Sequence, residues 1–338
     1  MRKTKYIFNG GRMSRKDNTL IFQPEPNNGV KVKPTYLPIE DVGNLYCFGA
    51  LDANSALYNF LGKQRVSLHF FDYYEHYTGS FMPKDYLWAG KLQVLQTQHY
   101  LELDKRMILA KSFVRGGSEA MVEVLKYYLR KDRNVRQAMV RIGELQFQIN
   151  DCEDVQMLMG IEGNVRKAYY SAFDAVILGD DFVMNGRSMR PPKNAVNALI
   201  SFGNMMCYTL CLDSIYHTQL NPTISFLHEP GAMRYSLALD IAEIFKPILV
   251  DRTIFSLINR KQLRLEHFDT HLNGIWLSDS GRKVFIKAYE ERLKETFKHP
   301  RMKKNVSYRT AVKYECHKLS RYLLTGEEYL PFSMVKQA

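Results

Sequence analysis

The sequence contains few cysteines, and they follow no pattern that would give them a shared role. Its 338 residues include five cysteines, an odd number with no Cys-x-x-Cys pair. Cys207 and Cys211 lie four residues apart in an apolar helical segment, where cysteine packs as a small hydrophobic side chain. We therefore predict a reducing, cytoplasmic environment.

Long apolar runs are also missing. No stretch approaches the roughly 18 uninterrupted apolar residues that span a bilayer. The N-terminal MRKTKYIFNGG has basic residues but lacks the apolar stretch of a secretory signal. No internal repeat or low-complexity tract is present. These absences predict a protein with no membrane partner, and the length leaves room for two domains with separate cores.

Basic residues are in excess. The chain has 47 Lys and Arg against 35 Asp and Glu, a formal net charge of +12. Residues 281–322 alone carry thirteen basic side chains against four glutamates, a net charge of +9. An excess of this size favours a polyanionic partner, because each phosphate that the protein neutralises releases counterions. The alternative is a set of solvated helix faces without a partner.

The periodicity changes near residue 83. Residues 1–82 are rich in β-branched and aromatic residues, with KYIFN (5–9) and TLIF (19–22) flanking a polar connection and one helix over 52–61. Residues 83–338 follow a helical period. We predict an α+β protein with a small, mostly antiparallel N-terminal β domain and a larger all-α C-terminal domain.

The segment 226–252 (FLHEPGAMRYSLALDIAEIFKPILVDR) carries a candidate metal site. His228 precedes a helix predicted to begin near Ser236, where Asp240 and Glu243 share one face. An imidazole with two carboxylates suits Mg²⁺ or Mn²⁺. Pro247 removes the N–H that would bond to the Glu243 carbonyl and is expected to bend the helix. The alternative is a surface histidine with two solvated carboxylates.

Glu162 interrupts the apolar stripe of a helix predicted over 154–177. A carboxylate on a buried face costs several kcal/mol unless a cation or metal compensates it, and such conflicts with the local pattern mark candidate sites. The flanking Gly160 and Gly163 let a substrate approach closely. An ion pair with Arg166, one helical turn later, is the alternative.

The sequence resembles the CRISPR-associated adaptation integrases, metal-dependent nucleases that insert spacers into CRISPR arrays. The resemblance spans nearly the whole chain and rests on four blocks in order: GIEGNVRKAYYSAFD (160–174), RPPKNAVNALISFGNMMCYT (190–209), FLHEPGAMRYSLALDIAEIFKPILVDR (226–252) and LSDSGRKVFIKAYEERL (277–293). It implies that Glu162, His228 and Glu243 bind Mg²⁺ or Mn²⁺. Asp240 is implied to be a further catalytic acid, which binds a second metal or orients the first.

The same resemblance implies the reaction and the partners. The 3′-hydroxyl of an incoming DNA end attacks a phosphodiester, a transesterification, and water as nucleophile gives nuclease activity. Expected partners are double-stranded DNA, a second copy of the chain joined through the N-terminal domain, and a small ferredoxin-like protein. The predicted DNA-binding residues are Arg166, Arg252, Arg260, Lys303 and Lys304.

Three alternatives stay open at this point. His267 and His271 lie four residues apart and could share a helix face as a different metal site, although no His-Glu-x-x-His glutamate is present. A stand-alone repair nuclease acting on branched DNA would need no small partner. A catalytically inert DNA-binding scaffold would use the acidic residues for structure only.

Overall fold

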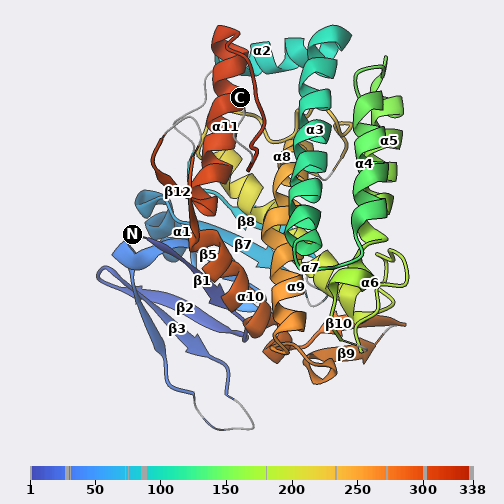
Figure 1. The fold of residues 1–338 in the computed structure, drawn as a ribbon. Helices are drawn as coiled ribbons and strands as arrows, with labels where there is room; N and C mark the ends of the chain where they lie inside the picture. The colour runs from blue at the N-terminus through green and yellow to red at the C-terminus, as the bar shows by residue number, and fades with distance from the viewer. Residues whose placement is uncertain are drawn as a thin grey trace. The chain divides into compact units, whose positions relative to one another are not determined.

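The computed structural model describes residues 2–26, 30, 32–72, 74, 76–84, 90–179, 181–232, 234–271, 273–299 and 303–334. The chain divides into two compact units, Met1–Tyr86 and Leu87–Ala338. The first is rich in strands and the second in helices (Figure 1). The predicted α+β class is confirmed.

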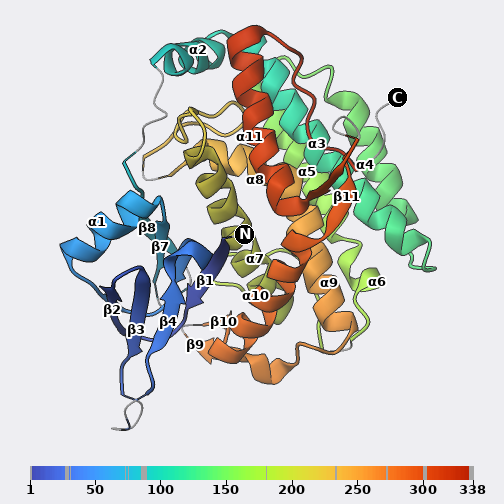
Figure 2. The same ribbon diagram turned by 90° about the vertical axis from the view of Figure 1, so that its left-hand side faces the viewer.

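Two four-stranded sheets build the N-terminal unit. The first has the order β1 (Lys3–Ile7), β5 (Val42–Cys47), β7 (Ser67–Phe71) and β8 (Tyr77–Phe81). The second has the order β4 (Thr35–Pro38), β3 (Thr19–Pro24), β2 (Gly11–Lys16) and β6 (Leu51–Asp52), and Figure 2 shows β2, β3 and β4 side by side. A 3₁₀ turn (Ile39–Asp41) and α1 (Ser55–Gln64) complete the unit. Met13, Leu20, Leu45, Leu61 and Leu68 are fully buried in its core.

Three predictions for this unit are wrong in detail. The segment read as a polar connection between 5–9 and 19–22 contains β2, which pairs with β3 across a turn at Asp17. Only Gly11 and Met13 of β2 are buried, and the other residues of the strand are polar and exposed. The segment therefore lacks the apolar pattern by which a strand is recognised. The pairings are not mostly antiparallel either, because β1–β5, β5–β7 and β2–β6 are parallel. The helix predicted over 52–61 begins later, where Asn54 accepts a hydrogen bond from the backbone N–H of Leu57.

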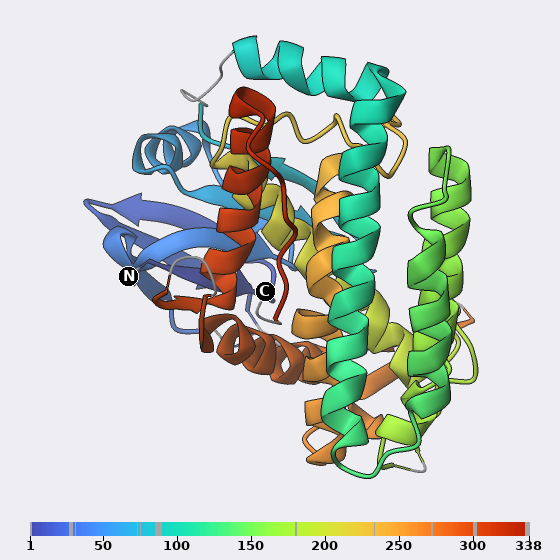
Figure 3. The ribbon, with the colours of Figure 1, turned by 45° about the horizontal axis from the view of Figure 1, so that its top comes forward.

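The helices of the C-terminal unit are α2 (Gly90–Leu101), α3 (Leu103–Leu129), α4 (Arg136–Gln148), α5 (Val155–Tyr170), α6 (Phe173–Val176), α7 (Ala195–Tyr216), α8 (Ser236–Lys246), α9 (Arg252–Asn259), α10 (Asp279–Lys294) and α11 (Tyr308–Thr325). Helix α7 packs against α8, α9 and α11, and Figure 3 shows the long α3 running beside α8 and close to α4 and α5. A π-helical turn (Pro247–Asp251) joins α8 to α9, and a 3₁₀ turn spans Leu265–His267. The prediction of an all-α domain is corrected by two short hairpins, β9 (Phe268–His271) with β10 (Gly274–Leu277) and β11 (Thr296–Lys298) with β12 (Asn305–Ser307).

The apolar helix α7 lies at the centre of this unit. Among the described residues it is the one helix long and apolar enough to cross a membrane, and 78% of its most apolar stretch is buried inside the protein. A Cβ on Gly203 would lie 2.3 Å from Cγ1 of Val250, so glycine is needed for α7 to approach the π-helical turn. This contact fixes the segment that follows the candidate acids of α8.

Candidate functional site

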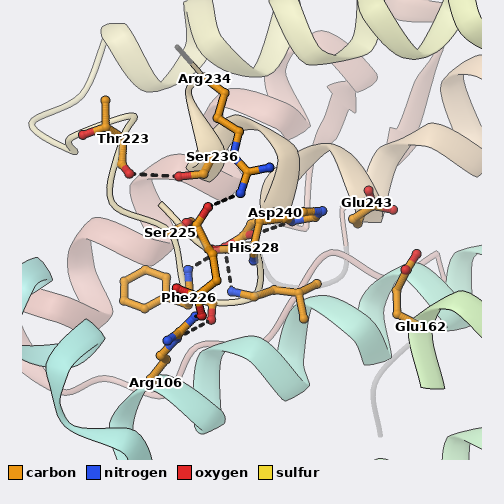
Figure 4. A network of polar contacts seen from close by, with 12 residues as sticks. Arg106, Glu162, Thr223, Ser225, Phe226, His228, Arg234, Ser236, Asp240 and Glu243 are labelled. Atoms are coloured by element: carbon orange, nitrogen blue, oxygen red, sulfur yellow. Dashed lines mark hydrogen bonds and ion pairs between the residues drawn. The ribbon is translucent and has the colours of Figure 1, made fainter. Parts of the chain in front are cut away.

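Asp240 organises the loop that carries His228. Its carboxylate, fully buried on α8, accepts hydrogen bonds from the backbone N–H groups of Phe226 (2.7 Å), Leu227 (3.0 Å) and His228 (3.0 Å). From α3, Arg106 donates to the carbonyl of Phe226 at 2.8 Å. The loop is therefore held from two helices (Figure 4).

The start and end of α8 differ in part from prediction. The helix begins at Ser236 as expected, but the Ser236 hydroxyl donates to the Thr223 carbonyl at 2.9 Å and makes no cap. Pro247 begins the π-helical turn, which accommodates the missing N–H.

The imidazole of His228 has a fixed orientation. Its Nδ1 lies 2.8 Å from Oδ1 of Asp240, and because the carboxylate accepts, Nδ1 carries a proton, so that in the neutral imidazole Nε2 has the lone pair. Burial lowers the pKa of His228, but the hydrogen bond and charge of Asp240 outweigh it and raise the pKa above its ordinary value. A histidine whose other nitrogen donates to a carboxylate is the usual arrangement of a metal ligand.

Glu162 and Glu243 meet around a single cation. Nη2 of Arg166 contacts Oε1 of Glu162 and Oε2 of Glu243, and Lys246 donates to Oε1 of Glu243 at 2.6 Å. Burial raises the pKa of Glu243, but the charges of Arg166 and Lys246 lower it well below its ordinary value. The ion pair between Glu162 and Arg166, which was the alternative explanation for a carboxylate at position 162, is therefore present, and it extends to a second acid from another helix.

The predicted three-ligand cluster is not assembled in this arrangement. In the part of the chain that the structure describes, no three His, Cys, Asp or Glu side chains lie close enough to hold a metal ion. Instead, Arg166 contacts both Glu162 and Glu243. His228 lies against Asp240, and Figure 4 shows this pair and the two glutamates.

The residues nevertheless fit a divalent cation. Oε1 of Glu162 and Oε2 of Glu243 both contact Nη2 of Arg166, so the two carboxylates already meet at one positively charged group. Asp240 is bonded to Nδ1 of His228, which leaves Nε2 available as a metal ligand. Carboxylate and imidazole donors suit Mg²⁺ or Mn²⁺, and such an ion would take the place of the Arg166 guanidinium.

A cavity of about 510 Å³ adjoins this group, and we call it the Arg166 cavity. Its lining includes Arg166, Lys167, Tyr170 and Arg187. Gly163 also lines it, and a Cβ there would meet no atom within 4 Å, so the helix surface is open to a ligand. The cavity has room for a phosphate group beside Arg166, which contacts both carboxylates.

Sequence reasoning missed two cations near the acids. Lys246 lies one turn after Glu243, a spacing that could have identified it. Arg187 comes from the irregular loop before α7, where its guanidinium donates to Oδ1 of Asn197 at 2.9 Å. Loop residues follow no regular period, so nothing in the sequence indicated that Arg187 would lie near the candidate site.

The five predicted DNA-binding residues fall in three places. Arg166 lies between the two acids. Arg252 and Arg260 line a second cavity beside Tyr127. Lys303 and Lys304 are exposed in the connection between β11 and β12.

The structure does not support the alternative metal site at His267 and His271. His267 ends a 3₁₀ turn and His271 ends β9, so the two do not share a helix face. Nδ1 of His267 accepts a hydrogen bond from the backbone N–H of Arg264 at 3.0 Å. The pair belongs to no metal-binding group among the described residues.

Comparison with solved structures reveals related folds. A CAS1 protein from Thermotoga maritima superposes with a TM-score of 0.86 at 38% identity, covering 97% of this chain and 98% of that one. A casposase bound to integration product has a TM-score of 0.88 at 18% identity, covering 100% of this chain and 95% of that one. The likeness to the casposase, at 18% identity, shows a shared fold and nothing about function.

The sequence comparisons cover most of the chain. The family model described as CRISPR associated protein Cas1 matches residues 6–291. A protein from Moorella thermoacetica named CRISPR-associated endonuclease Cas1 2 is 45% identical over 332 residues, covering 98% of this chain and 99% of that one. The resemblance inferred from the four sequence blocks is thereby confirmed, and the chain belongs to the Cas1 family of CRISPR-associated proteins.

Proposed function

We propose that this chain is a divalent-metal-dependent DNA endonuclease and integrase that inserts spacer DNA into a CRISPR array. The observation that carries the proposal is the meeting of Glu162 and Glu243 around one cation, beside an imidazole that Asp240 orients. Membership of a family whose curated relatives are named endonucleases supports it.

Each side chain has a role in this proposal. Glu162, Glu243 and His228 would hold Mg²⁺ or Mn²⁺, which when bound polarises a phosphodiester oxygen and stabilises the developing charge. Asp240 fixes the tautomer of His228 and closes the loop around it. Arg166, once released from the carboxylates, is placed to contact a phosphate entering the Arg166 cavity.

The reaction is a phosphodiester exchange. In integration, the 3′-oxygen of the incoming strand forms a bond to phosphorus, the bond to the 3′-oxygen of the array strand breaks, and that oxygen takes up the proton that the attacking hydroxyl loses. With water as the nucleophile the same displacement cuts the strand.

The family assignment supports a proposal for the partners and the location. We propose a homodimer joined through the N-terminal unit, working in a prokaryotic cytoplasm with a small ferredoxin-like adaptation protein on double-stranded DNA. The basic residues Arg252, Arg260, Lys303 and Lys304 would contact DNA phosphates. Co-purification of a partner of about 90–100 residues distinguishes this assembly from a stand-alone repair nuclease, which needs none.

Metal removal tests the proposal. Purified protein with Mn²⁺ or Mg²⁺ should cut labelled duplex DNA and join a DNA end to an array fragment, and EDTA should abolish both activities because the carboxylates then hold no metal ion. Products are resolved on denaturing gels. DNA binding that EDTA leaves intact, without cutting or joining at any metal concentration, would instead identify a non-catalytic scaffold.

A further inference from the structure

Arg106 of α3 contacts the chain on both sides of His228. Its Nε donates to the carbonyl of Phe226 at 2.8 Å, and its Nη2 donates to Oε1 of Glu229 at 2.6 Å. Phe226 lies two residues before the histidine and Glu229 one residue after it, and Figure 4 shows Arg106 beside Phe226. Because the donors of a guanidinium have a fixed relative geometry, this one group sets the positions of both flanks of His228.

Tyr100 of α2 completes this contact. Its hydroxyl donates to Oε2 of Glu229 at 2.8 Å, so both oxygens of that carboxylate are bonded. Cζ of Arg106 lies 4.4 Å from the centroid of the Tyr100 ring, a cation–π distance that restrains the guanidinium from a second side. We call Tyr100, Arg106 and Glu229 the Arg106 clamp.

The rest of the loop is held independently of the clamp. Gln96, fully buried on α2, donates to the carbonyls of Asn221 (2.9 Å) and Ile224 (2.7 Å) and accepts from the backbone N–H of Asn221 at 2.9 Å. From α8, Asp240 accepts the backbone N–H groups of residues 226–228. Loss of the clamp should therefore shift the loop and not unfold it.

Stability alone does not account for the clamp. The Arg106 side chain is 11% exposed, but that of Glu229 is 60% exposed. An ion pair with so exposed a partner adds little to the free energy of unfolding, because water screens the charges and holding the side chains costs entropy. Metal–ligand distances, by contrast, vary by only about 0.2 Å around their ideal values. A small shift of the loop would therefore cost more in metal binding than in stability.

We propose that Arg106 is a positioning residue that acts through His228. Its bonds to Phe226 and Glu229 hold the imidazole where Nε2 can bind the metal ion. The inference rests on the proposed function, because it requires His228 to be a metal ligand. It adds a role for α2 and α3, neither of which contributes a proposed ligand.

A double-mutant cycle on Mn²⁺ affinity tests the inference. Arg106→Gln, which removes the charge and the paired donors, is made in the parent protein and in His228→Ala. Electron paramagnetic resonance of free Mn²⁺ gives the affinity of each protein without any measurement of activity. The control is Lys105→Gln, which removes the neighbouring cation of α3, paired with Glu102 at 2.7 Å. Thermal melting establishes that each variant folds.

We expect Arg106→Gln to weaken Mn²⁺ binding at least tenfold in the parent but less than twofold in His228→Ala, because the clamp then has no ligand to position. His228→Ala alone should weaken binding at least as much as Arg106→Gln does. Lys105→Gln should change the affinity less than twofold in both backgrounds. An equal loss from Arg106→Gln in both backgrounds, or no loss in the parent, would overturn the inference.

Tyr100→Phe is the second variant, and it decides the inference if Arg106→Gln does not melt cooperatively. It removes one hydroxyl from the clamp and keeps the ring beside Arg106. It should weaken Mn²⁺ binding at least twofold in the parent and leave it unchanged in His228→Ala, and the same loss in both would again overturn the inference. If His228→Ala binds Mn²⁺ as tightly as the parent, the proposed metal centre itself fails. If only the clamp variants do so, the proposed function stands without this inference.

Discussion

Glu162→Gln should lower metal-dependent cutting and joining of DNA at least a hundredfold, a loss of about 2.7 kcal/mol in transition-state stabilisation. Glutamine keeps the size of the side chain but removes the charge that contacts Arg166 and that would bind the metal. Single-turnover rates at saturating Mn²⁺ measure the effect, because they separate the chemical step from product release.

The control for this variant is Glu153→Gln. Glu153 is exposed just before α5, so the substitution removes the same charge near the same helix without touching the site. It should cut DNA at the wild-type rate, and both variants should melt as cooperatively as the parent. A Glu162→Gln protein that retained its rate within a few fold would remove Glu162 from the mechanism.

Arg166→Gln should increase the affinity for Mn²⁺ at least tenfold. Arg166 contacts Oε1 of Glu162 and Oε2 of Glu243, the carboxylates proposed to bind the metal, so we expect the guanidinium and the metal to compete for them. Without the guanidinium, the carboxylates of Glu162 and Glu243 face each other. The Glu162 side chain is only 16% exposed and the Glu243 side chain 7%. Their repulsion favours a divalent cation, and electron paramagnetic resonance of free Mn²⁺ measures the affinity directly.

The same variant should be less stable without metal and recover when metal is added. Removing one partner from a buried ion pair costs on the order of 3 kcal/mol, although Lys246 still pairs with Glu243. Mn²⁺ should therefore raise the melting temperature more in Arg166→Gln than in the parent. Lys167→Gln, an exposed neighbour, is the control. Unchanged Mn²⁺ affinity in Arg166→Gln would show that the guanidinium does not compete with the metal.

Local patterns predicted the helical unit better than the sheets. The 3.6-residue period distinguished the helical unit from the strands, and the helix predicted over 154–177 corresponds to α5 and α6, which the structure separates at residues 171–172. The start of α5 has a local signal, because Asp154 accepts a hydrogen bond from the backbone N–H of Met157 at 2.8 Å. The parallel pairing of β1 with β5 joins segments about 40 residues apart. No single stretch of sequence records such a pairing, so the sequence could indicate individual strands but not which strands pair.

The candidate site was likewise predictable only where a local sequence pattern indicates it. Glu162 was detectable because a carboxylate interrupts an apolar stripe, and Asp240 and Glu243 because their spacing places them on one helix. The three backbone N–H groups that converge on Asp240 depend on a loop conformation that side-chain patterns do not encode. The Arg166 bridge to Glu243 joins residues 77 positions apart, so it too required the fold.

The central claim is that Glu162, Glu243 and His228 hold one divalent cation. Anomalous diffraction from a crystal of the protein grown with Mn²⁺ tests it most directly, since the anomalous signal locates the metal independently of activity. We predict a peak bonded to oxygens of Glu162 and Glu243 and to Nε2 of His228, with Arg166 turned away from both carboxylates. A peak elsewhere, or none while Arg166 still bridges the two acids at saturating Mn²⁺, would contradict the account.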